Sequence, residues 1–465
     1  MATATLAAPA PPVHALAQAD LVARYDGRAP RYTSYPTAVQ FTPAIDAATY
    51  RSWLADLPAH VPVSIYVHVP FCGRLCWYCG CNTRAVTRHG PIADYVKLLL
   101  DELYALSDAL PARVPVRAIH LGGGTPNMLT PRELAALFGG LRTEFSVAQD
   151  GEIAAELDPA VLTRAWVEAA GRQGLNRASL GVQNLDKRVQ RAVNRHETFE
   201  QIAAGVGWLR DVGVTSINLD LMYGLPFQTA ANTLQTVEAV LQLEPERIAL
   251  FGYAHVPWMK THQKLIPEAA LPGPAERIDQ AEAAAARLLE AGYVRIGLDH
   301  FARPDDALAE ASTAGTVHRN FQGYTTDGAR TLLGLGASAI GRLPQGYVQN
   351  AAQEVAWRDA VKTKGLAVVR GVALSADDLF RGEIIERLMC DLRVDLAAVC
   401  ARHDRPLSDL DSAIHALAPA VGDGLVVLEE RGLRVVGDGR LVVRSICAAF
   451  DAYFDPAAHR HAKAL

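Results

Sequence analysis

The sequence predicts an α/β fold built on parallel strands, and three observations support this prediction. Short segments rich in β-branched and apolar residues begin near residue 63, and each is followed by a longer segment with helical periodicity. This alternation stops after about residue 370, where the pattern becomes mostly helical. At 465 residues the chain also exceeds what one hydrophobic core usually organises. We therefore expect a large α/β domain and at least one smaller domain.

The predicted strands and helices follow one another in a regular order. Strands are predicted at residues 64–70, 118–124, 152–158, 177–183, 216–222 and 247–253. Helices are predicted at residues 92–106, 131–145, 160–174, 199–213, 231–244 and 276–292. Alternating strands and helices favour parallel strands joined by right-handed crossovers. Because a closed barrel needs about eight such units, we expect an incomplete, TIM-like (β/α)6 barrel whose open side is extended or covered by later segments.

The alternation also predicts where the domains begin and end. Residues 1–18, rich in Ala and Pro, are expected to form a mobile leader, and residues 19–60 an N-terminal arm. The barrel with its extension is expected at residues 61–370. Residues 371–465 are expected to form a smaller, mostly helical C-terminal domain, because 375–403 reads as helical and 424–450 fits a hairpin followed by a helix.

Composition argues against several classes of function. Half of the residues are apolar, a fifth are charged and the net charge is −5, which is typical of a globular protein and gives no support for nucleic-acid binding. No apolar run approaches the roughly 18 residues needed to cross a bilayer, and the N-terminus lacks the features of a signal peptide. We therefore expect a cytoplasmic protein that does not act at a membrane.

Four of the seven cysteines lie in one short stretch, "FCGRLCWYCGCN", at Cys72, Cys76, Cys79 and Cys81. Thiols stay reduced in the cytoplasm, so this stretch indicates a metal or redox site rather than disulfides. The CxxxCxxC spacing of the first three lets one loop surround a compact centre, and a four-iron cubane bound by three cysteines keeps one iron open. Zinc is the alternative, but four-cysteine zinc sites usually draw paired ligands from two separated segments.

The other cysteines are given different roles. Cys81 lies only two residues beyond Cys79 and would have to double back to reach the last iron, so we predict that Cys81 is not an iron ligand. Cys390, Cys400 and Cys447 are expected to be small buried hydrophobic residues.

Polar residues gather where the predicted strands end, namely Glu156, Asp158, Gln183 and Asp220. In parallel α/β folds the carboxyl edge of the sheet holds the active site. We expect the active site at this edge, beside the cysteine-rich loop.

The CxxxCxxC motif after the first strand resembles that of the radical S-adenosylmethionine enzymes. More narrowly, "YVHVPFCGRLCWYCGCN", "HLGGGTPNML", "LGVQNLDKRVQRAVNR", "NLDLMYGLPFQT", "GLDHFARPDD" and "HRNFQGYTT" are similar to motifs of the oxygen-independent coproporphyrinogen III oxidase family. The likeness runs from about Arg31 into the C-terminal domain. The longer Ala/Pro-rich leader is the one departure from the family pattern.

The resemblance implies a 4Fe-4S cluster whose open iron binds S-adenosylmethionine. One electron would cleave this molecule to a 5′-deoxyadenosyl radical, which takes hydrogen from a propionate of the substrate. Loss of carbon dioxide and one electron, on two propionates, would convert coproporphyrinogen III to protoporphyrinogen IX in haem biosynthesis. The resemblance also implies an electron donor and an electron acceptor, neither identified by the sequence, and we expect a monomer.

Site residues are carried over by the same resemblance. The cluster ligands would be Cys72, Cys76 and Cys79. The first S-adenosylmethionine would lie near Tyr66, Tyr78, Gly123, Gly124, Thr125 and Glu156. A second one would lie near Gln183, Arg195, Asp220, Ala254 and Ile340. From the residues alone, simpler interpretations stay open: a shielding role for Tyr78, a tight turn at the glycines, and a structural carboxylate at Glu156.

The substrate carries four carboxylates, which a chain of net charge −5 must hold by local positive charge. Arginine suits this task through bidentate hydrogen bonds. The candidates are Arg31, Arg303, His318 and Arg319, and for each an ordinary surface ion pair stays open. The family-like "RYTSYPT" motif further predicts that the N-terminal arm closes over the active site.

Three other functions remain as alternatives. A haem-binding chaperone with the same barrel typically lacks the "CGC" ending and the long arm, both of which are present here. A radical enzyme that modifies transfer RNA should carry a basic accessory surface, which the charge does not support. A purely structural zinc protein is the third.

Overall fold

The computed structural model describes residues 17–455 of the chain. The predicted leader, residues 1–18, therefore lies outside the described residues except for its last two. The first helix, α1, covers Gln18–Tyr25.

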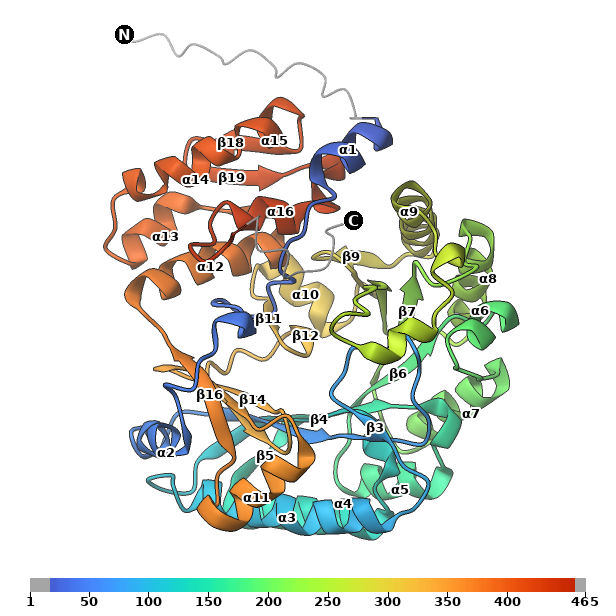
Figure 1. Ribbon diagram of the computed structural model, residues 1–465, viewed down its shortest axis with the longest axis vertical. Helices are drawn as coiled ribbons and strands as arrows, with labels where there is room; N and C mark the ends of the chain where they lie inside the picture. Colours follow the sequence, from blue (N-terminus) through green and yellow to red (C-terminus); the bar gives the residue numbers. More distant parts are fainter. Residues whose placement is uncertain (1–16, 456–465) are drawn as a thin grey trace.

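A twelve-stranded sheet forms the centre of the molecule (Figure 1). Six of its strands lie side by side in chain order, and every neighbouring pair of the six is parallel. They are β1 (Val63–Val69), β4 (Pro115–Gly123), β5 (Ser146–Leu157), β6 (Arg177–Gln183), β7 (Ser216–Tyr223) and β8 (Arg247–Gly252). The predicted α/β fold with a large parallel sheet is confirmed, since these strands match the six predicted segments within three residues, except that β5 begins six residues earlier.

Later segments extend the sheet at both edges. Beside β1, strand β13 (Leu332–Leu335) adds a further parallel strand, and β14 (Ile340–Leu343), β15 (Gly346–Asn350) and β16 (Val368–Ala373) continue antiparallel. Beside β8, the antiparallel strands β10 (His300–Ala302) and β9 (Val294–Ile296) complete the order.

Helices follow the parallel strands and pack on them in one large hydrophobic core. Threonines begin several of them: Thr130 and Thr198 each form a capping box, and Thr163 caps the helix that was predicted from residue 160, which therefore starts at Arg164. The helices of this core are α3 (Gly90–Ser107), α4 (Pro131–Glu144), α5 (Arg164–Arg172), α7 (Phe199–Asp211), α8 (Ala230–Leu241), α9 (Pro274–Glu290) and α11 (Glu354–Lys364). Two further helices, α6 (Lys187–Ala192) and α10 (Ala307–Ala314), pack in smaller clusters.

The C-terminal part has its own hydrophobic cluster. Its helices are α12 (Ala376–Asp391), α13 (Leu396–Arg402), α14 (Asp411–Ala416), α15 (Ala418–Gly422) and α16 (Val443–Ala448). They accompany a small antiparallel sheet of β17 (Arg393–Val394), β18 (Val426–Glu429) and β19 (Gly432–Val435). Cys390, Cys400 and Cys447 are all buried, which confirms their predicted packing role.

The N-terminal arm joins both parts of the molecule. Leu21, Tyr32 and Tyr35 pack into the C-terminal cluster, and the hydroxyl of Tyr32 lies 3.1 Å from Oδ2 of Asp451. The following helix α2 (Ala47–Ala55) packs instead on the main core. In Figure 1 the arm accordingly runs from the C-terminal helices down to the sheet. The predicted boundaries at residues 18, 60 and 370 stay predictions, although strand β16 continues across residue 370.

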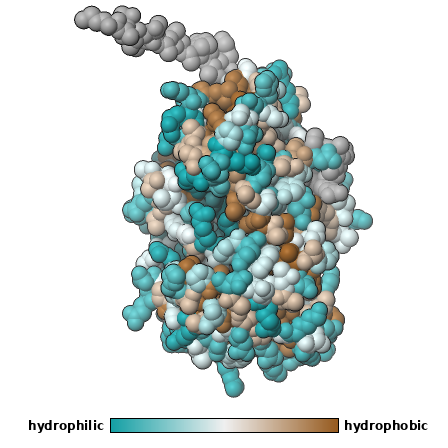
Figure 2. All heavy atoms as spheres, turned by 90° about the vertical axis from the view of Figure 1, so that its left-hand side faces the viewer, coloured by the Kyte–Doolittle hydropathy of each residue, from teal (hydrophilic) through white to brown (hydrophobic). Residues whose placement is uncertain are grey.

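The surface mixes polar and apolar side chains. On the face drawn in Figure 2, brown apolar patches are scattered among teal polar ones. Throughout residues 17–455, every helix is too short or too polar to traverse a lipid bilayer.

Candidate active site

The cysteine-rich loop begins directly after β1 and is closed at its base. Two short strands, β2 (Phe71–Cys72) and β3 (Arg84–Ala85), pair with each other, and the amide of Val86 donates to the carbonyl of Cys72 at 2.9 Å. The loop between these strands carries Cys76, Cys79 and Cys81. It therefore presents its thiols beside the carboxyl end of β1, where the active site was predicted.

Each of the three predicted ligand thiols has polar partners. The hydroxyl of Thr125 donates to Sγ of Cys72 at 3.3 Å, and Nη1 of Arg195 donates to Sγ of Cys76 at 3.5 Å. Hydrogen bonds from the side chain and amide of Cys81 lower the pKa of Cys79 to about 7, although burial opposes this shift. On Cys79 the donors thus favour the thiolate, which is the form that binds metal. On Cys72 and Cys76 burial outweighs the donors and raises the pKa of each thiol.

The arrangement fits an iron–sulfur cubane better than a single ion. Among residues 17–455, no three His, Cys, Asp or Glu side chains are grouped to hold one metal ion. A cubane takes one cysteine per iron, so its ligands need not converge on one point. Cys81 is the exposed member of the four, whereas Cys76 is buried and the other two are intermediate.

The glycines after β4 let the backbone pass close to the loop. Gly123 has φ +114°, and a Cβ there would lie 2.8 Å from the ring of His68. A Cβ on Gly124 would lie 2.3 Å from Oγ1 of Thr83 and 2.7 Å from the carbonyl oxygen of Phe71. The glycines are thus needed for packing against the start of the cysteine loop, whatever else they bind.

Replacing Gly124 with alanine is expected to displace the cysteine loop. The new methyl group meets the backbone of Phe71, one residue before Cys72, so the clash cannot be relieved by turning a side chain. We expect a loss of about 1–3 kcal/mol in stability together with reduced iron content, measured by thermal unfolding and iron titration. Gly139→Ala is the matched control, because nothing lies within 4 Å of its Cβ position in α4; equal losses in both variants would contradict the prediction.

Glu156 at the end of β5 accepts two hydrogen bonds. Nε2 of His120 donates to Oε1 at 3.0 Å, and the amide of Gly123 donates to Oε2 at 3.2 Å. Burial raises its pKa, but these donors outweigh burial and hold the pKa of Glu156 below its usual range. On β1, which is separated from β5 by β4, the hydroxyl of Tyr66 lies 3.0 Å from Nδ1 of His68. An ionised carboxylate and ring donors therefore line the carboxyl ends of β1, β4 and β5.

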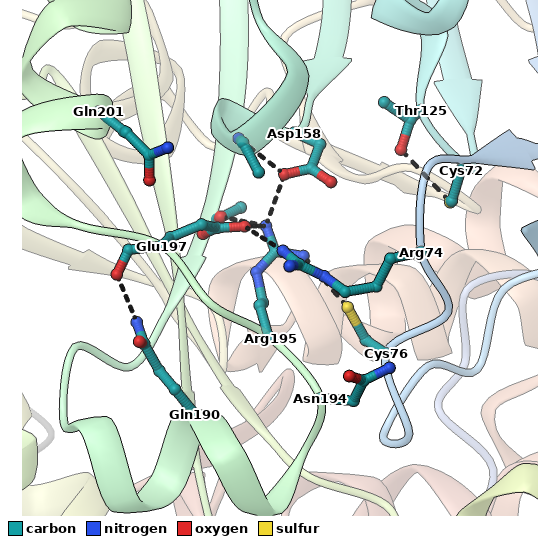
Figure 3. Close-up of polar contacts among 12 residues, drawn as sticks. Cys72, Arg74, Cys76, Thr125, Asp158, Gln190, Asn194, Arg195, Glu197 and Gln201 are labelled. Atoms are coloured by element: carbon teal, nitrogen blue, oxygen red, sulfur yellow. Dashed lines mark hydrogen bonds and ion pairs between the residues drawn. The ribbon is translucent and has the colours of Figure 1, made fainter. Parts of the chain in front are cut away.

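Arg195 occupies the centre of a buried charge network (Figure 3). Its Nη2 lies 2.8 Å from Oε1 of Glu197 and 3.5 Å from Oδ1 of Asp158. Its Nη1 faces Cys76 and the Tyr78 hydroxyl, the latter at 3.2 Å. The Glu197 side chain is 0% exposed, and burial raises its pKa to about 8 despite Arg195. The network thus places the positively charged guanidinium of Arg195 beside the sulfur of Cys76.

Gln183 and Asp220 lie next to this network. Gln183 has φ +64°, and its side-chain nitrogen lies near Gly181, beside Arg195. Its Oε1 is buried without a hydrogen-bond partner in the described part of the chain. Asp220 accepts from the Ser179 hydroxyl at 2.9 Å, while burial raises its pKa to about 7. A buried acceptor without a donor is what a bound polar ligand would satisfy.

The backbone of Ala254 lies beside the thiol loop, and that of Ile340 lies beside the strand that pairs with β1. Nε2 of Gln263 donates both to the carbonyl of Tyr78 at 3.0 Å and to that of Ala254 at 3.3 Å. Ile340 lies against Gly334, which pairs in register with Tyr66 of β1.

A cavity of about 560 Å³ opens where β7 and β8 end. Tyr223, Gly252 and Ala254 form part of its wall, so the cavity adjoins the thiol loop through Gln263. Among its described lining residues Asp299 is the one acidic side chain. The arginines that line it are Arg28, Arg31, Arg277, Arg295, Arg319 and Arg444.

Comparison with known proteins decides the family. Residues 66–240 match the radical SAM superfamily and residues 374–442 match the HemN C-terminal domain. The chain is 50% identical, over 96% of its length and all of the relative, to the oxygen-independent coproporphyrinogen III oxidase of Bradyrhizobium diazoefficiens. It is 41% identical to that of Escherichia coli, over 93% of this chain and 94% of the relative. The chain also resembles a solved structure, that of coproporphyrinogen III oxidase (HemN) from Escherichia coli, a radical SAM enzyme. The TM-score is 0.88 at 39% identity, and the match covers 91% of this chain and 98% of that one. The chain belongs to the oxygen-independent coproporphyrinogen III oxidase family.

The four residues predicted to bind the substrate of this oxidase family lie in three different places in the structure. Arg31 and Arg319 line the large cavity. His318 lies 3.2 Å from Glu386 and lines a smaller neighbouring cavity. Arg303 lines neither cavity and faces Asp305 at 3.4 Å on the surface.

Several residues around the oxidase family's site were missed from the sequence. Four of the cavity arginines were not predicted: Arg28, Arg277, Arg295 and Arg444. His68, His120 and Glu197 were also missed. Glu197 was detectable in principle, because an acidic residue two positions after Arg195 in "NRHE" is a candidate for an ion pair. The distant arginines carry no comparable local signal.

Proposed function

We propose that this protein is an oxygen-independent coproporphyrinogen III oxidase, which converts two propionates of coproporphyrinogen III to vinyl groups and yields protoporphyrinogen IX. The observation that carries the proposal is the arginine-lined cavity adjoining the three-thiol loop. Its volume, about 560 Å³, lies in the range of small-molecule sites. The relatives at 50% and 41% identity support the same reaction.

The charge of the cavity suits a substrate with four carboxylates. Six arginines and a single acidic residue line it in a chain whose net charge is −5. Burial lowers the pKa of Arg444 to about 10, which still leaves it charged at neutral pH. On Arg319, Nε and Nη1 are buried without hydrogen-bond partners among the described residues, so both can donate to a carboxylate.

The chain would hold its cofactors at the carboxyl ends of the parallel strands. Cys72, Cys76 and Cys79 would bind a 4Fe-4S cluster, which supplies the electron that cleaves S-adenosylmethionine and so starts hydrogen abstraction. The ionised carboxylate of Glu156 and the Gly123 backbone, which lie 3.2 Å apart at the strand ends, would hold a first S-adenosylmethionine. The unsatisfied Oε1 of Gln183 supports a second one beside Arg195.

We further infer the finer organisation of the molecule. The parallel strands with intervening helices support an incomplete (β/α)6 barrel, and the separate hydrophobic cluster supports a C-terminal domain from about residue 371. Arg31 on the cavity wall supports an arm that closes the site and excludes water. Seven unpaired cysteines support a cytoplasmic protein, and we propose that it acts as a monomer.

Anaerobic turnover tests the proposal. The reconstituted protein, given reductant, S-adenosylmethionine and coproporphyrinogen III, should form 5′-deoxyadenosine in proportion to decarboxylated porphyrinogen. Calorimetry with S-adenosylmethionine alone should give two bound molecules per chain, and one would refute the second site. Tight haem binding without any decarboxylation would overturn the oxidase in favour of a haem chaperone.

A further inference from the structure

The most exposed large apolar side chains of the described residues gather around one loop. Met259 is 64% exposed, Leu265 58%, Val355 58% and Trp258 55%, whereas every other large apolar residue is at most 48% exposed. We call these four residues the apolar patch, which borders the large cavity because Trp258 also lines that cavity. Large exposed apolar side chains that cluster, rather than scatter, mark interaction surfaces.

Three of the patch residues belong to a segment that is hydrogen-bonded to the cysteine loop. Within residues 260–263, three side chains donate to carbonyl oxygens of that loop: Lys260 to Cys81 at 3.0 Å, His262 to Cys79 at 2.7 Å and Gln263 to Tyr78 at 3.0 Å. Trp258, Met259 and Leu265 flank these contacts in the chain. They are therefore held beside the backbone of the third ligand, Cys79.

Val355 is held on the other side of the same loop. Nδ2 of Asn82 donates to the carbonyl of Ala352 at 2.9 Å, and Nε of Arg84 donates to Oε2 of Glu354 at 2.6 Å. Val355 follows Glu354 at the start of α11. Figure 1 shows the blue loop after β1 between the yellow-green segment that follows β8 and the orange helix α11.

Positive charge accompanies the patch. Arg88, just after the cysteine loop, and Lys264 are exposed, and Lys260 contributes a third cation. The acidic residues of the same segments, Glu268 and Glu354, pair with His255 and Arg84, so Arg84 is neutralised and is not counted among these cations. A basic, apolar surface on a chain of net charge −5 is complementary to an acidic partner.

We propose that the apolar patch with its cations is the docking surface for a small acidic electron-transfer protein. This inference rests on the proposed function, because the reaction needs one electron per S-adenosylmethionine from outside the chain. The docked donor loses one electron and the cluster bound by Cys72, Cys76 and Cys79 gains it. The exposed Cys81 lies between the two halves of the patch, so docking there brings a redox centre close to the cluster loop.

Reduction by a protein donor, compared with reduction by dithionite, tests the docking surface. The probe is a reduced acidic 2Fe-2S ferredoxin, mixed anaerobically in stopped flow with the reconstituted protein before any porphyrinogen is added. Met259→Glu/Leu265→Glu/Val355→Glu should lower the second-order rate of cluster reduction by ferredoxin about tenfold or more, because it sets like charges opposite the donor. Dithionite is small and needs no docking site, so its rate and the iron content should stay at wild-type values.

Leu289→Glu/Leu407→Glu is the matched control, since both leucines are 48% exposed and lie outside the patch. It should leave both rates unchanged.

Binding of oxidised ferredoxin to the surface-immobilised protein, read by plasmon resonance without turnover, should weaken in the patch variant and with rising salt. Equal ferredoxin rates in the wild type and the patch variant would overturn the proposal. A wild-type homodimer in analytical sedimentation that becomes a monomer in the patch variant would also overturn it. Because no porphyrinogen is present, these readouts stand even if the decarboxylation assay fails.

Discussion

Cys72→Ala, Cys76→Ala and Cys79→Ala are each expected to lose the iron–sulfur cluster and all turnover, while Cys81→Ser keeps both. The three predicted ligands have hydroxyl, guanidinium or amide donors on their sulfurs, from Thr125, Arg195 and Cys81 respectively. Cys81 is exposed and its amide donates to Cys79 at 3.4 Å. Its expected role is thus to support a ligand rather than to be one. Iron and sulfide titration with electron paramagnetic resonance of the reduced protein gives the measurement.

Cys447→Ala serves as the control for this prediction. It removes a thiol that is 0% exposed in the C-terminal cluster, far in the sequence from the loop. It should lower thermal stability and leave the iron content unchanged. Loss of the cluster in Cys81→Ser would show that all four irons carry protein sulfur, and the open iron on which the proposed chemistry depends would not exist.

Arg319→Gln is expected to raise KM for coproporphyrinogen III by about tenfold to about a hundredfold with a smaller change in kcat. A hydrogen bond to a charged group contributes about 1.5–3 kcal/mol. Arg319 lines the cavity with its guanidinium carbon 4.4 Å from the centre of the Tyr324 ring, which fixes its direction. Burial opposes its charge, but nearby Tyr324 and Asp299 outweigh burial and raise the pKa of Arg319, so it stays charged throughout the assay range.

Arg303→Gln is the matched control, because Arg303 lies 3.4 Å from the exposed Asp305 and outside both cavities. It should leave KM and kcat near wild-type values. Arg319→Lys keeps the charge without the planar fork and is expected to restore KM only in part. A larger KM effect in Arg303→Gln than in Arg319→Gln would contradict the assignment of the cavity as the substrate site.

Much of the sheet could be predicted from the sequence because each strand and helix carries its own periodicity. Strand β1 is buried on both faces apart from the partly buried Tyr66, so "SIYVHV" is mostly apolar, and the helices that follow keep one apolar face. The helix boundary at Thr163 was missed because its cap depends on one side chain rather than on the periodic pattern. Small elements such as α6 were missed for the same reason, since six residues give too few turns to show a period.

The sequence by itself determined the parallel α/β order and the thiol loop, because each depends on residues that are close together in the chain. Only the tertiary structure decided which arginines line the cavity. Arg303 and Arg319 look alike in sequence, yet one lies on the surface and the other in the cavity with Arg31, Arg277 and Arg444. These come from the arm, α9, strand β11 (His318–Asn320) and α16, and long-range packing alone brings such segments together. The charges that surround a bound substrate therefore depend on the fold. The residues that bind a compact metal centre can all lie in one loop, so the sequence alone can reveal them.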